Sequence, residues 1–340
     1  MNNIYGCTRE KLEEYFLSIG EKKFKALQVF EWLYEKKNNH VEEWSNIKKE
    51  IREKIANDFS FERPKIIRTE RDTLTRKYLF ELKDNNHIEA VVMYHDYGIS
   101  LCVSSQVGCN MGCAFCESGR LKKVRNLETF EMVSQILEIE EDIGDRISSV
   151  VIMGIGEPLD NYDNVLDFIH IINDAKGLAL GIRHITLSTS GLVPKIYDLM
   201  KENIQINLAV SLHAPNDEIR NRIMKVNQVY NISQLIQAIK DYIAHTNRRV
   251  TIEYVMLKGI NDSESCAIEL AHLLKGMNIY VNLIPYNETN HINLYKSDAS
   301  TISTFCKKLK ELGINVTIRK EFGSKISAAC GQLRSKEVEK

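Results

Sequence analysis

The chain has 340 residues, of which 44% are hydrophobic and 27% are charged, and 45 basic against 46 acidic residues give a formal net charge of −1. This length suits one large α/β domain with a smaller one attached, and the composition is typical of a globular protein. The apolar runs are too short to span a bilayer and the N-terminus lacks the apolar core of a signal peptide, so we expect a cytoplasmic protein with no membrane partner. The balanced charge neither predicts nor excludes nucleic-acid binding, because a local basic face is compatible with acidic surface elsewhere.

The first predicted elements are helices. Between Thr8 and Asn57, apolar residues recur at intervals of three and four positions, which is the spacing of helices with one apolar face. Four short β-rich segments follow, within residues 65–106, and turn residues separate them. They predict a small meander.

From there the chain alternates between strands and helices. Apolar strand candidates lie at residues 148–154, 184–190, 206–213, 250–257 and 280–287, and the helical stretches begin near Thr129, Tyr162, Val193, Ile232, Ser263 and Ser300. Repeated β-then-α units predict a parallel sheet, either open or closed into a barrel. Unusual polar clusters follow the strands, and the carboxyl ends of parallel strands meet at one edge. We therefore expect these clusters to share one pocket.

One such cluster is the loop "GCNMGCAFCESG", which places Cys109, Cys113 and Cys116 at C-x3-C-x2-C spacing. Structural zinc normally has four protein ligands, and a fourth would have to come from elsewhere in the chain. Buried apolar thiols are a second alternative, although the surrounding glycines suggest a loop that wraps around something. An iron–sulfur cube takes one cysteine per iron, so three cysteines would leave one iron open to a small molecule. We favour the cluster.

The other clusters are ambiguous when taken singly. Gly156 and Glu157 lie in a strand-to-helix turn, while Ser188, Ser211, His213 and Asn287 follow later strands. Polar side chains at such positions also cap helices.

Taken in order, these segments resemble the RlmN/Cfr-type radical S-adenosylmethionine (SAM) ribosomal RNA adenine methyltransferases. The matching segments run from "ALQVFEWLY" to "AACGQLR" and include "LCVSSQVGCNMGCAFC", "MGIGEPLDNY", "LAVSLHAPN" and "YVNLIPYN". The resemblance implies a partial (β/α)6 TIM-like radical SAM barrel over residues 95–333, which includes the C-terminal cysteine segment. It also implies an N-terminal helical accessory domain at 1–60 that binds RNA, a small β extension at 61–94, and a tail at 334–340.

The resemblance also implies the cofactors. Cys109, Cys113 and Cys116 would hold one [4Fe–4S] cluster, SAM would bind the fourth iron, and each turnover would use two SAM molecules. The residues implied to bind SAM are Gly156, Glu157, Ser188, Ser211, Leu212, His213 and Asn287. An electron donor such as flavodoxin or ferredoxin is a further implied partner, and a monomer is the expected state.

The same family assigns roles in catalysis. Cys330 would carry the transferred carbon as an S-methylcysteine, and a radical formed on it would add to adenine and briefly crosslink the protein to RNA. Cys102 would then release the product by forming a transient disulfide with Cys330, and Glu89 matches the proposed proton acceptor. The implied substrate is 23S rRNA or, in addition, transfer RNA.

The chain departs from the family pattern at Glu117-Ser118 and at Ser324-Lys325. Phe322-Gly323 is similar to the antibiotic-resistance branch that methylates carbon 8, whereas Val107 and "GEPLDNY" are similar to the carbon-2 branch, which we favour. A zinc-stabilised RNA-binding module without chemistry is the alternative of a different class. Candidate phosphate contacts are Arg120, Lys122, Lys123, Arg125, Arg220, Arg222, Lys225, Arg248 and Arg249.

Overall fold

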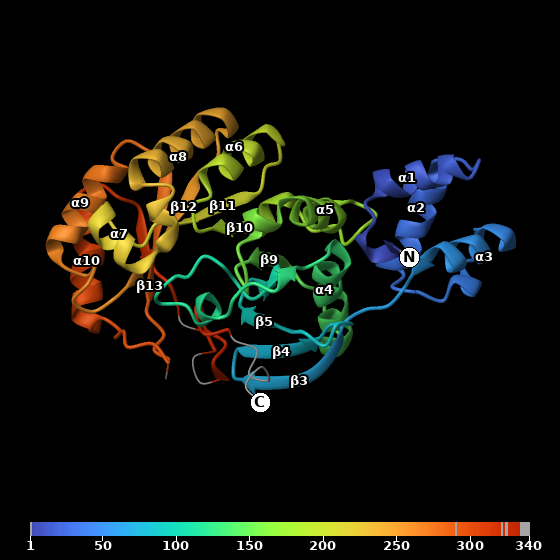
Figure 1. The fold of residues 1–340 in the computed structure, drawn as a ribbon, viewed down its shortest axis with the longest axis horizontal. Helices are drawn as coiled ribbons and strands as arrows, with labels where there is room; N and C mark the ends of the chain where they lie inside the picture. Colours follow the sequence, from blue (N-terminus) through green and yellow to red (C-terminus); the bar gives the residue numbers. More distant parts are fainter. Residues whose placement is uncertain (1, 290, 321, 324–325, 334–340) are drawn as a thin grey trace.

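The computed structural model describes residues 2–289, 291–320, 322–323 and 326–333. A lobe of N-terminal helices lies to one side of a large sheet that is covered by helices (Figure 1). The tail expected at 334–340 lies outside the described residues, and so does Ser324-Lys325, where the sequence departs from the family pattern. Among the described residues, no helix combines the length and the apolar character needed to cross a membrane.

The N-terminal lobe contains the helices predicted between Thr8 and Asn57. They are α1 (Arg9–Ser18), α2 (Phe24–Phe30), a π turn η2 (Glu31–Glu35) and α3 (Lys49–Asp58), with short 3₁₀ turns η1 (Ile4–Gly6) and η3 (Val41–Glu43). Trp44 and Phe30 are fully buried between them, and the rings of Trp32 and Trp44 stack with centroids 6.4 Å apart. The lobe therefore has an apolar core of its own.

One ten-stranded sheet organises the rest of the chain, in the order β14-β13-β12-β11-β10-β9-β6-β5-β4-β3. The antiparallel part is the predicted meander, formed by β3 (Lys65–Asp72), β4 (Thr75–Glu81), β5 (His87–His95) and β6 (Gly98–Cys102). The parallel part adds β9 (Ser149–Ile152), β10 (Ile185–Thr189), β11 (Asn207–Ser211), β12 (Val250–Met256), β13 (Ile279–Pro285) and β14 (Val316–Ile318). The meander is continuous with the parallel strands because β6 pairs with both β5 and β9.

A helical segment follows each of six successive parallel strands, as expected for a (β/α)6 arrangement. These helices are α4 (Thr129–Ile143), α5 (Tyr162–Asn173), α6 (Val193–Lys201), α7 (Asp217–Ile223) with α8 (Ile232–Thr246), α9 (Glu264–Leu274) and α10 (Ala299–Glu311). The helix starts predicted from the sequence agree with these bounds. The sheet remains open, with β14 and β3 as its edges, so the predicted partial barrel is confirmed.

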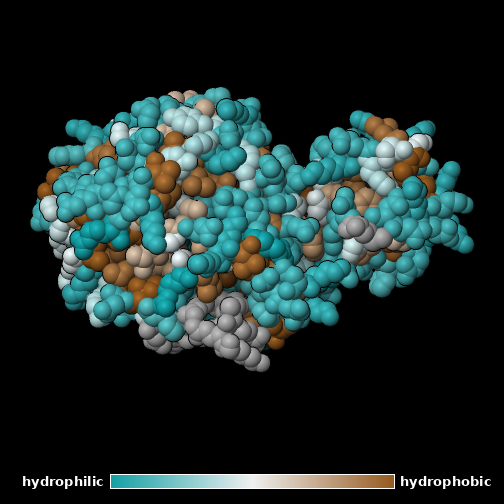
Figure 2. All heavy atoms as spheres, viewed as in Figure 1, coloured by the Kyte–Doolittle hydropathy of each residue, from teal (hydrophilic) through white to brown (hydrophobic). Residues whose placement is uncertain are grey.

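Apolar side chains lie between the sheet and its helices, and the outer surface is largely hydrophilic (Figure 2). The central strands β11, β12 and β13 are mostly buried along their length, as expected where helices cover a parallel sheet. The remaining short elements are β1 (Asn2–Asn3) paired with β2 (Phe59–Ser60), β7 (Gln106–Val107) paired with β8 (Arg125–Asn126), and the turns η4 (Glu117–Arg120), η5 (Pro158–Asn161), η6 (Ile182–His184) and η7 (Lys225–Gln228).

Candidate active site

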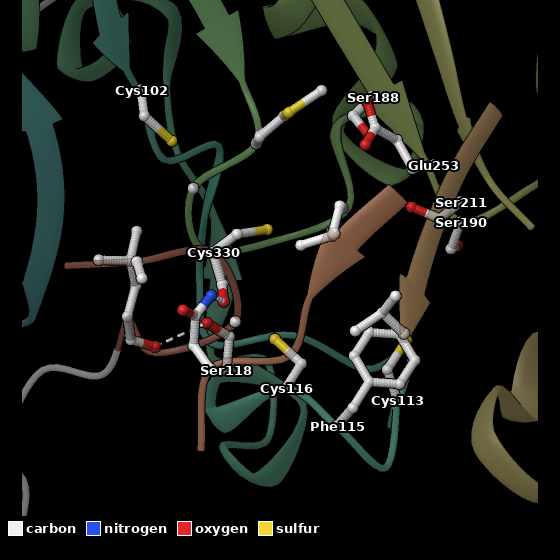
Figure 3. Close-up of a pocket in the computed structure, with 18 of the residues that line it drawn as sticks. Cys102, Cys113, Phe115, Cys116, Ser118, Ser188, Ser190, Ser211, Glu253 and Cys330 are labelled. Carbon is white, nitrogen blue, oxygen red and sulfur yellow. Dashed lines mark hydrogen bonds between the residues drawn. The ribbon is translucent and has the colours of Figure 1, made fainter. Parts of the chain in front are cut away.

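A cavity lies at the carboxyl ends of the parallel strands and is closed on one side by the C-terminal segment (Figure 3). The residues singled out in the sequence meet in it, as predicted. This one cavity is lined by Cys102, Cys109, Cys113, Cys116, Gly156, Glu157, Ser188, Ser211, His213, Asn287 and Cys330. Leu212 and Glu89 are not among the lining residues. Leu212 is fully buried in the apolar core, and Glu89 is buried to one side on β5.

The three-cysteine loop between β7 and β8 folds back on itself. The backbone N–H of Cys109 donates to the carbonyl of Leu121 at 3.0 Å, and that of Cys116 donates to the carbonyl of Cys113 at 3.2 Å. Gly119 fits only as glycine, because a Cβ there would lie 2.9 Å from the Cys113 carbonyl oxygen. The loop thereby directs three sulfur atoms to one end of the cavity.

These three thiols suit a cluster better than a single ion. Burial raises the pKa of Cys109 to about 12 and raises those of Cys113 and Cys116 as well. A cationic centre bound to the sulfurs would offset the cost of burying thiolates. Among the described residues, no three His, Cys, Asp or Glu side chains converge closely enough to hold one metal ion. Three cysteines are one ligand short of the four protein ligands of structural zinc, and they are compatible with a cube in which each cysteine binds a different iron.

The turn after β9 is held by Gln106 and by two backbone donors. The Gln106 amide oxygen accepts from the Glu157 N–H at 2.9 Å, and a Cβ on Gly156 would lie 2.6 Å from the Gln106 Cβ. The Glu157 carboxylate accepts from the N–H of Ser190 at 2.7 Å and from that of Leu159 at 3.2 Å. Burial raises the pKa of Glu157, and the hydrogen bonds from Ser190, Thr189 and Leu159 act in the opposite direction.

His213 joins the three-cysteine loop to β12. Its Nδ1 accepts from the N–H of Val255 at 3.0 Å, and its ring meets that of Phe115 edge to face at 4.8 Å. Burial, followed by the charge of Arg220, lowers the pKa of His213 to about 3. The imidazole is therefore neutral at pH 7, and it suits a contact with a ligand better than proton transfer.

Arg220 corrects one sequence-based expectation. Its guanidinium is fully buried, so it cannot be the predicted phosphate contact. Its Nη2 donates to the carbonyls of Ser190 at 2.7 Å and Ser211 at 3.1 Å, and its Nε donates to the carbonyl of Leu212 at 3.1 Å. One cation thus ties together the loops after β10 and β11.

Other predicted phosphate contacts also have protein partners. Lys123 pairs with Asp160 at 2.7 Å, and Arg125 pairs with Glu131 and Asp84 at 2.7 and 2.6 Å. Arg248 and Arg249 precede β12, at the end of the sheet opposite the cavity. Arg120 donates to the carbonyl of His291, and phosphate contacts by Lys122, Arg222 and Lys225 stay predictions.

The C-terminal segment brings Cys330 into the cavity. In the view of Figure 3 its side chain lies between those of Cys102 and Cys116, and all three line the cavity. Burial, followed by the proximity of Cys330, raises the pKa of Cys102 to about 12. All eight cysteines are free thiols in this structure, so a bond between Cys102 and Cys330 stays a prediction.

Glu89 lies beside a buried cation. The Nζ of Lys77, on the neighbouring strand β4, lies 3.4 Å from the Glu89 carboxylate and 3.3 Å from that of Glu70. Both Lys77 and Glu89 have side chains that are only 3% exposed. The Lys77 ammonium group therefore offsets part of the cost of burying the Glu89 carboxylate.

Sequence reasoning missed Glu253 and Arg319, which also line the cavity. Glu253 is buried on β12, and burial raises its pKa although Asn282 donates to it at 2.9 Å. A charged residue within the apolar segment "VTIEYVML" was the available signal. Arg319 follows β14, a strand too short to show a period.

The fold and the three-cysteine cavity define the class of protein. Residues 103–271 match the model of the Radical SAM superfamily, and residues 2–60 match that of the ribosomal RNA large subunit methyltransferase N-terminal domain. A solved radical SAM methyltransferase from Sphaerobacter thermophilus is 39% identical and superposes with a TM-score of 0.92, with 98% of this chain and 99% of that chain covered.

Curated relatives are more similar still. A protein of Acholeplasma laidlawii, named as a probable dual-specificity RNA methyltransferase RlmN, is 52% identical over 98% of this chain and 99% of its own length. One of Enterococcus faecalis with the same name is 51% identical, over 99% of this chain and 97% of its own. The chain belongs to the RlmN family of radical SAM methyltransferases.

Proposed function

We propose that this protein methylates a ring carbon of adenine in RNA, at carbon 2 in preference to carbon 8. The curated relatives are named RNA methyltransferases, and the similarity covers nearly the whole chain. The observation that carries the proposal is that Cys102 and Cys330 line the same cavity as the three cysteines of the β7–β8 loop. The proposed substrate is 23S rRNA, with transfer RNA as a second one.

The cavity would hold both cofactors. Cys109, Cys113 and Cys116 would hold the [4Fe–4S] cluster, and SAM would lie against Gly156, Glu157, Ser188, Ser211, His213 and Asn287, which line the cavity, whereas Leu212 does not. When bound, the reduced cluster and SAM supply a deoxyadenosyl radical that removes a hydrogen atom. The proposed electron donor is a flavodoxin or a ferredoxin, and the proposed location is the cytoplasm, with the protein as a monomer.

The chain's own residues perform the transfer. Cys330 carries the methyl group and, after that group has lost one hydrogen atom, forms the crosslink to adenine. Glu89, which lies outside the cavity lining, is the proposed acceptor of the proton that the adenine carbon loses, and the electron released with that proton would return to the cluster. Cys102 attacks the Cys330 sulfur, so that a disulfide forms and the methylated base is released. A cellular thiol reductant then restores both thiols.

Two measurements test this proposal. Mass spectrometry of nucleosides from a deletion strain should show loss of 2-methyladenosine. Loss of 8-methyladenosine would assign the other branch, and loss of neither would contradict methylation of an adenine carbon.

The second measurement concerns the metal. Anaerobically reconstituted protein should bind iron and sulfide, and the triple variant Cys109→Ala, Cys113→Ala, Cys116→Ala should not. The matched control replaces Cys7, Cys266 and Cys306, which do not line the cavity. Colourless protein holding stoichiometric zinc would support the RNA-binding module instead.

A further inference from the structure

Two stacked rings, those of His95 and Tyr97, form an exposed aromatic column beside the cavity, at the turn between β5 and β6. The ring of Tyr97 stacks on that of His95 with centroids 4.7 Å apart and an interplanar angle of 9°. Tyr97 is 78% exposed, more than any other large apolar side chain among the described residues. The turn itself is held close to the sheet, because Gly98 has φ +134° and Ser148 occupies the place that a Cβ would take.

This column is continuous with the cavity. The rings of His95 and Phe322 meet edge to face, with centroids 4.8 Å apart and an interplanar angle of 71°, and Phe322 lines the cavity together with Cys330. Met93, two residues before His95 on β5, lines it as well. Because alternate residues of a strand point to the same side, β5 leads from the cavity wall to the aromatic column.

Positive charge accompanies these rings. The Nζ of Lys320 lies 5.5 Å from the centroid of Phe322. Burial, followed by the charges of Lys320 and Arg319, lowers the pKa of His95, while Asp96 acts in the opposite direction. A neutral imidazole therefore supports Tyr97, and the cations next to it would attract phosphate groups.

We propose that Tyr97, supported by His95, is a stacking platform for an unpaired nucleobase of the RNA substrate, next to the adenine that enters the cavity. Flat aromatic faces beside basic side chains are the usual means of holding single-stranded nucleotides. A target adenine taken out of its stack leaves neighbouring bases without a partner, and a ring at the rim of the cavity replaces that partner. This role of Tyr97 rests on the proposed RNA substrate, and the stacking contact would help to hold that RNA at the cavity.

The test uses the reconstituted holoenzyme and a transcript of 23S rRNA. Tyr97→Ala should raise the KM and the Kd for the transcript about 5- to 100-fold, and Tyr97→Phe should keep both near their original values because stacking does not need the hydroxyl. Formation of 5′-deoxyadenosine and the thermal midpoint should not change. The control is Tyr280→Ala, a half-buried tyrosine on β13.

A fluorescent variant measures the contact with RNA directly, because the fluorescence of a residue with only a structural role would not change when RNA binds. In Tyr97→Trp the new indole should be quenched when the transcript binds, whereas the native Trp32 and Trp44 are buried in the N-terminal lobe and provide the background. Equal KM in Tyr97→Ala and the unaltered enzyme, or a loss in Tyr97→Phe as large as in Tyr97→Ala, would overturn the platform. An unaltered enzyme that does not methylate any RNA would overturn the proposed function instead.

Discussion

The side-chain amide of Asn287 donates a hydrogen bond of 3.2 Å to the carbonyl oxygen of Cys330. Two more contacts hold the same segment from the three-cysteine loop: the N–H of Glu117 donates to the carbonyl of Gly331 at 2.8 Å, and the Ser118 hydroxyl donates to that of Leu333 at 2.8 Å. The position of the Cys330 thiol is therefore coupled to the end of β13 and to the loop that holds the cysteines. Glu117-Ser118, a departure from the family pattern, is part of this connection.

Ser118→Ala should uncouple methyl transfer from SAM cleavage. This variant loses one hydrogen bond to the Cys330 segment, which we expect to lower the RNA methylation rate about three- to tenfold. Formation of 5′-deoxyadenosine should fall less, because the three cysteines remain. Asn173→Ala is the control, since that amide donates to the Leu180 carbonyl at 2.7 Å, away from the cavity. Equal decreases in both products would speak against this coupling.

The Cys102→Ala variant should accumulate protein joined covalently to RNA. Without this thiol nothing in the proposed sequence of steps attacks the Cys330 sulfur, so the crosslink forms and is not released. Denaturing gel electrophoresis with labelled RNA would detect the adduct. Cys266→Ala, a buried cysteine outside the cavity, should show none. Normal turnover by Cys102→Ala would refute the release role of Cys102.

Release of that crosslink should accelerate as the pH rises. The thiolate is the attacking form, and burial holds the pKa of Cys102 at about 12, so most of the thiol is protonated at neutral pH. Below this pKa the thiolate fraction, and with it the release rate, should increase about tenfold per pH unit. Single-turnover kinetics between about pH 7 and pH 9 would measure this slope.

Arg319 provides the control for the charge effect. Its guanidinium lowers the pKa of Cys102 against the effect of burial, so Arg319→Gln should slow release at a given pH, whereas Arg319→Lys should restore part of the rate. A release rate independent of pH in all three proteins would mean that another step limits turnover.

Much of this architecture could be predicted because local patterns determine it. The alternation of apolar strands and amphipathic helices predicted the six β/α units, and the position of polar clusters after the strands predicted a common pocket. The three-residue strand β14 was missed because it is too short to show alternation. The seven-residue helix α7 was also missed.

Long-range contacts could not be predicted from the sequence. Lys77 reaches Glu89 only through the pairing of β4 with β5, in which Leu79 lies opposite Glu89. Arg220 stands in the charged segment "NDEIRNRIMK", whose composition suggests an exposed surface. Its burial depends on carbonyl groups at the ends of two strands, and these come together only in the folded sheet.

Replacing Arg220 should weaken both the fold and SAM binding. Its guanidinium donates to the carbonyls of Ser190, Ser211 and Leu212 and also to the amide oxygen of Asn227 at 2.9 Å. Burial lowers its pKa to about 10, which still leaves it charged at neutral pH. Lysine has one ammonium group and cannot reach all four acceptors, so Arg220→Lys should lower the free energy of unfolding by about 3 kcal/mol.

Binding of SAM should weaken as well, because Ser190 and Ser211 line the cavity and their loops lose a common donor. Denaturant unfolding would measure the change in stability, and calorimetry well below the thermal midpoint would measure the affinity for SAM. Arg222→Lys, an exposed arginine on the same helix α7, is the matched control. If Arg220→Lys loses stability but binds SAM as tightly as the unaltered protein, then the loops keep their positions without Arg220 and its role is confined to the fold.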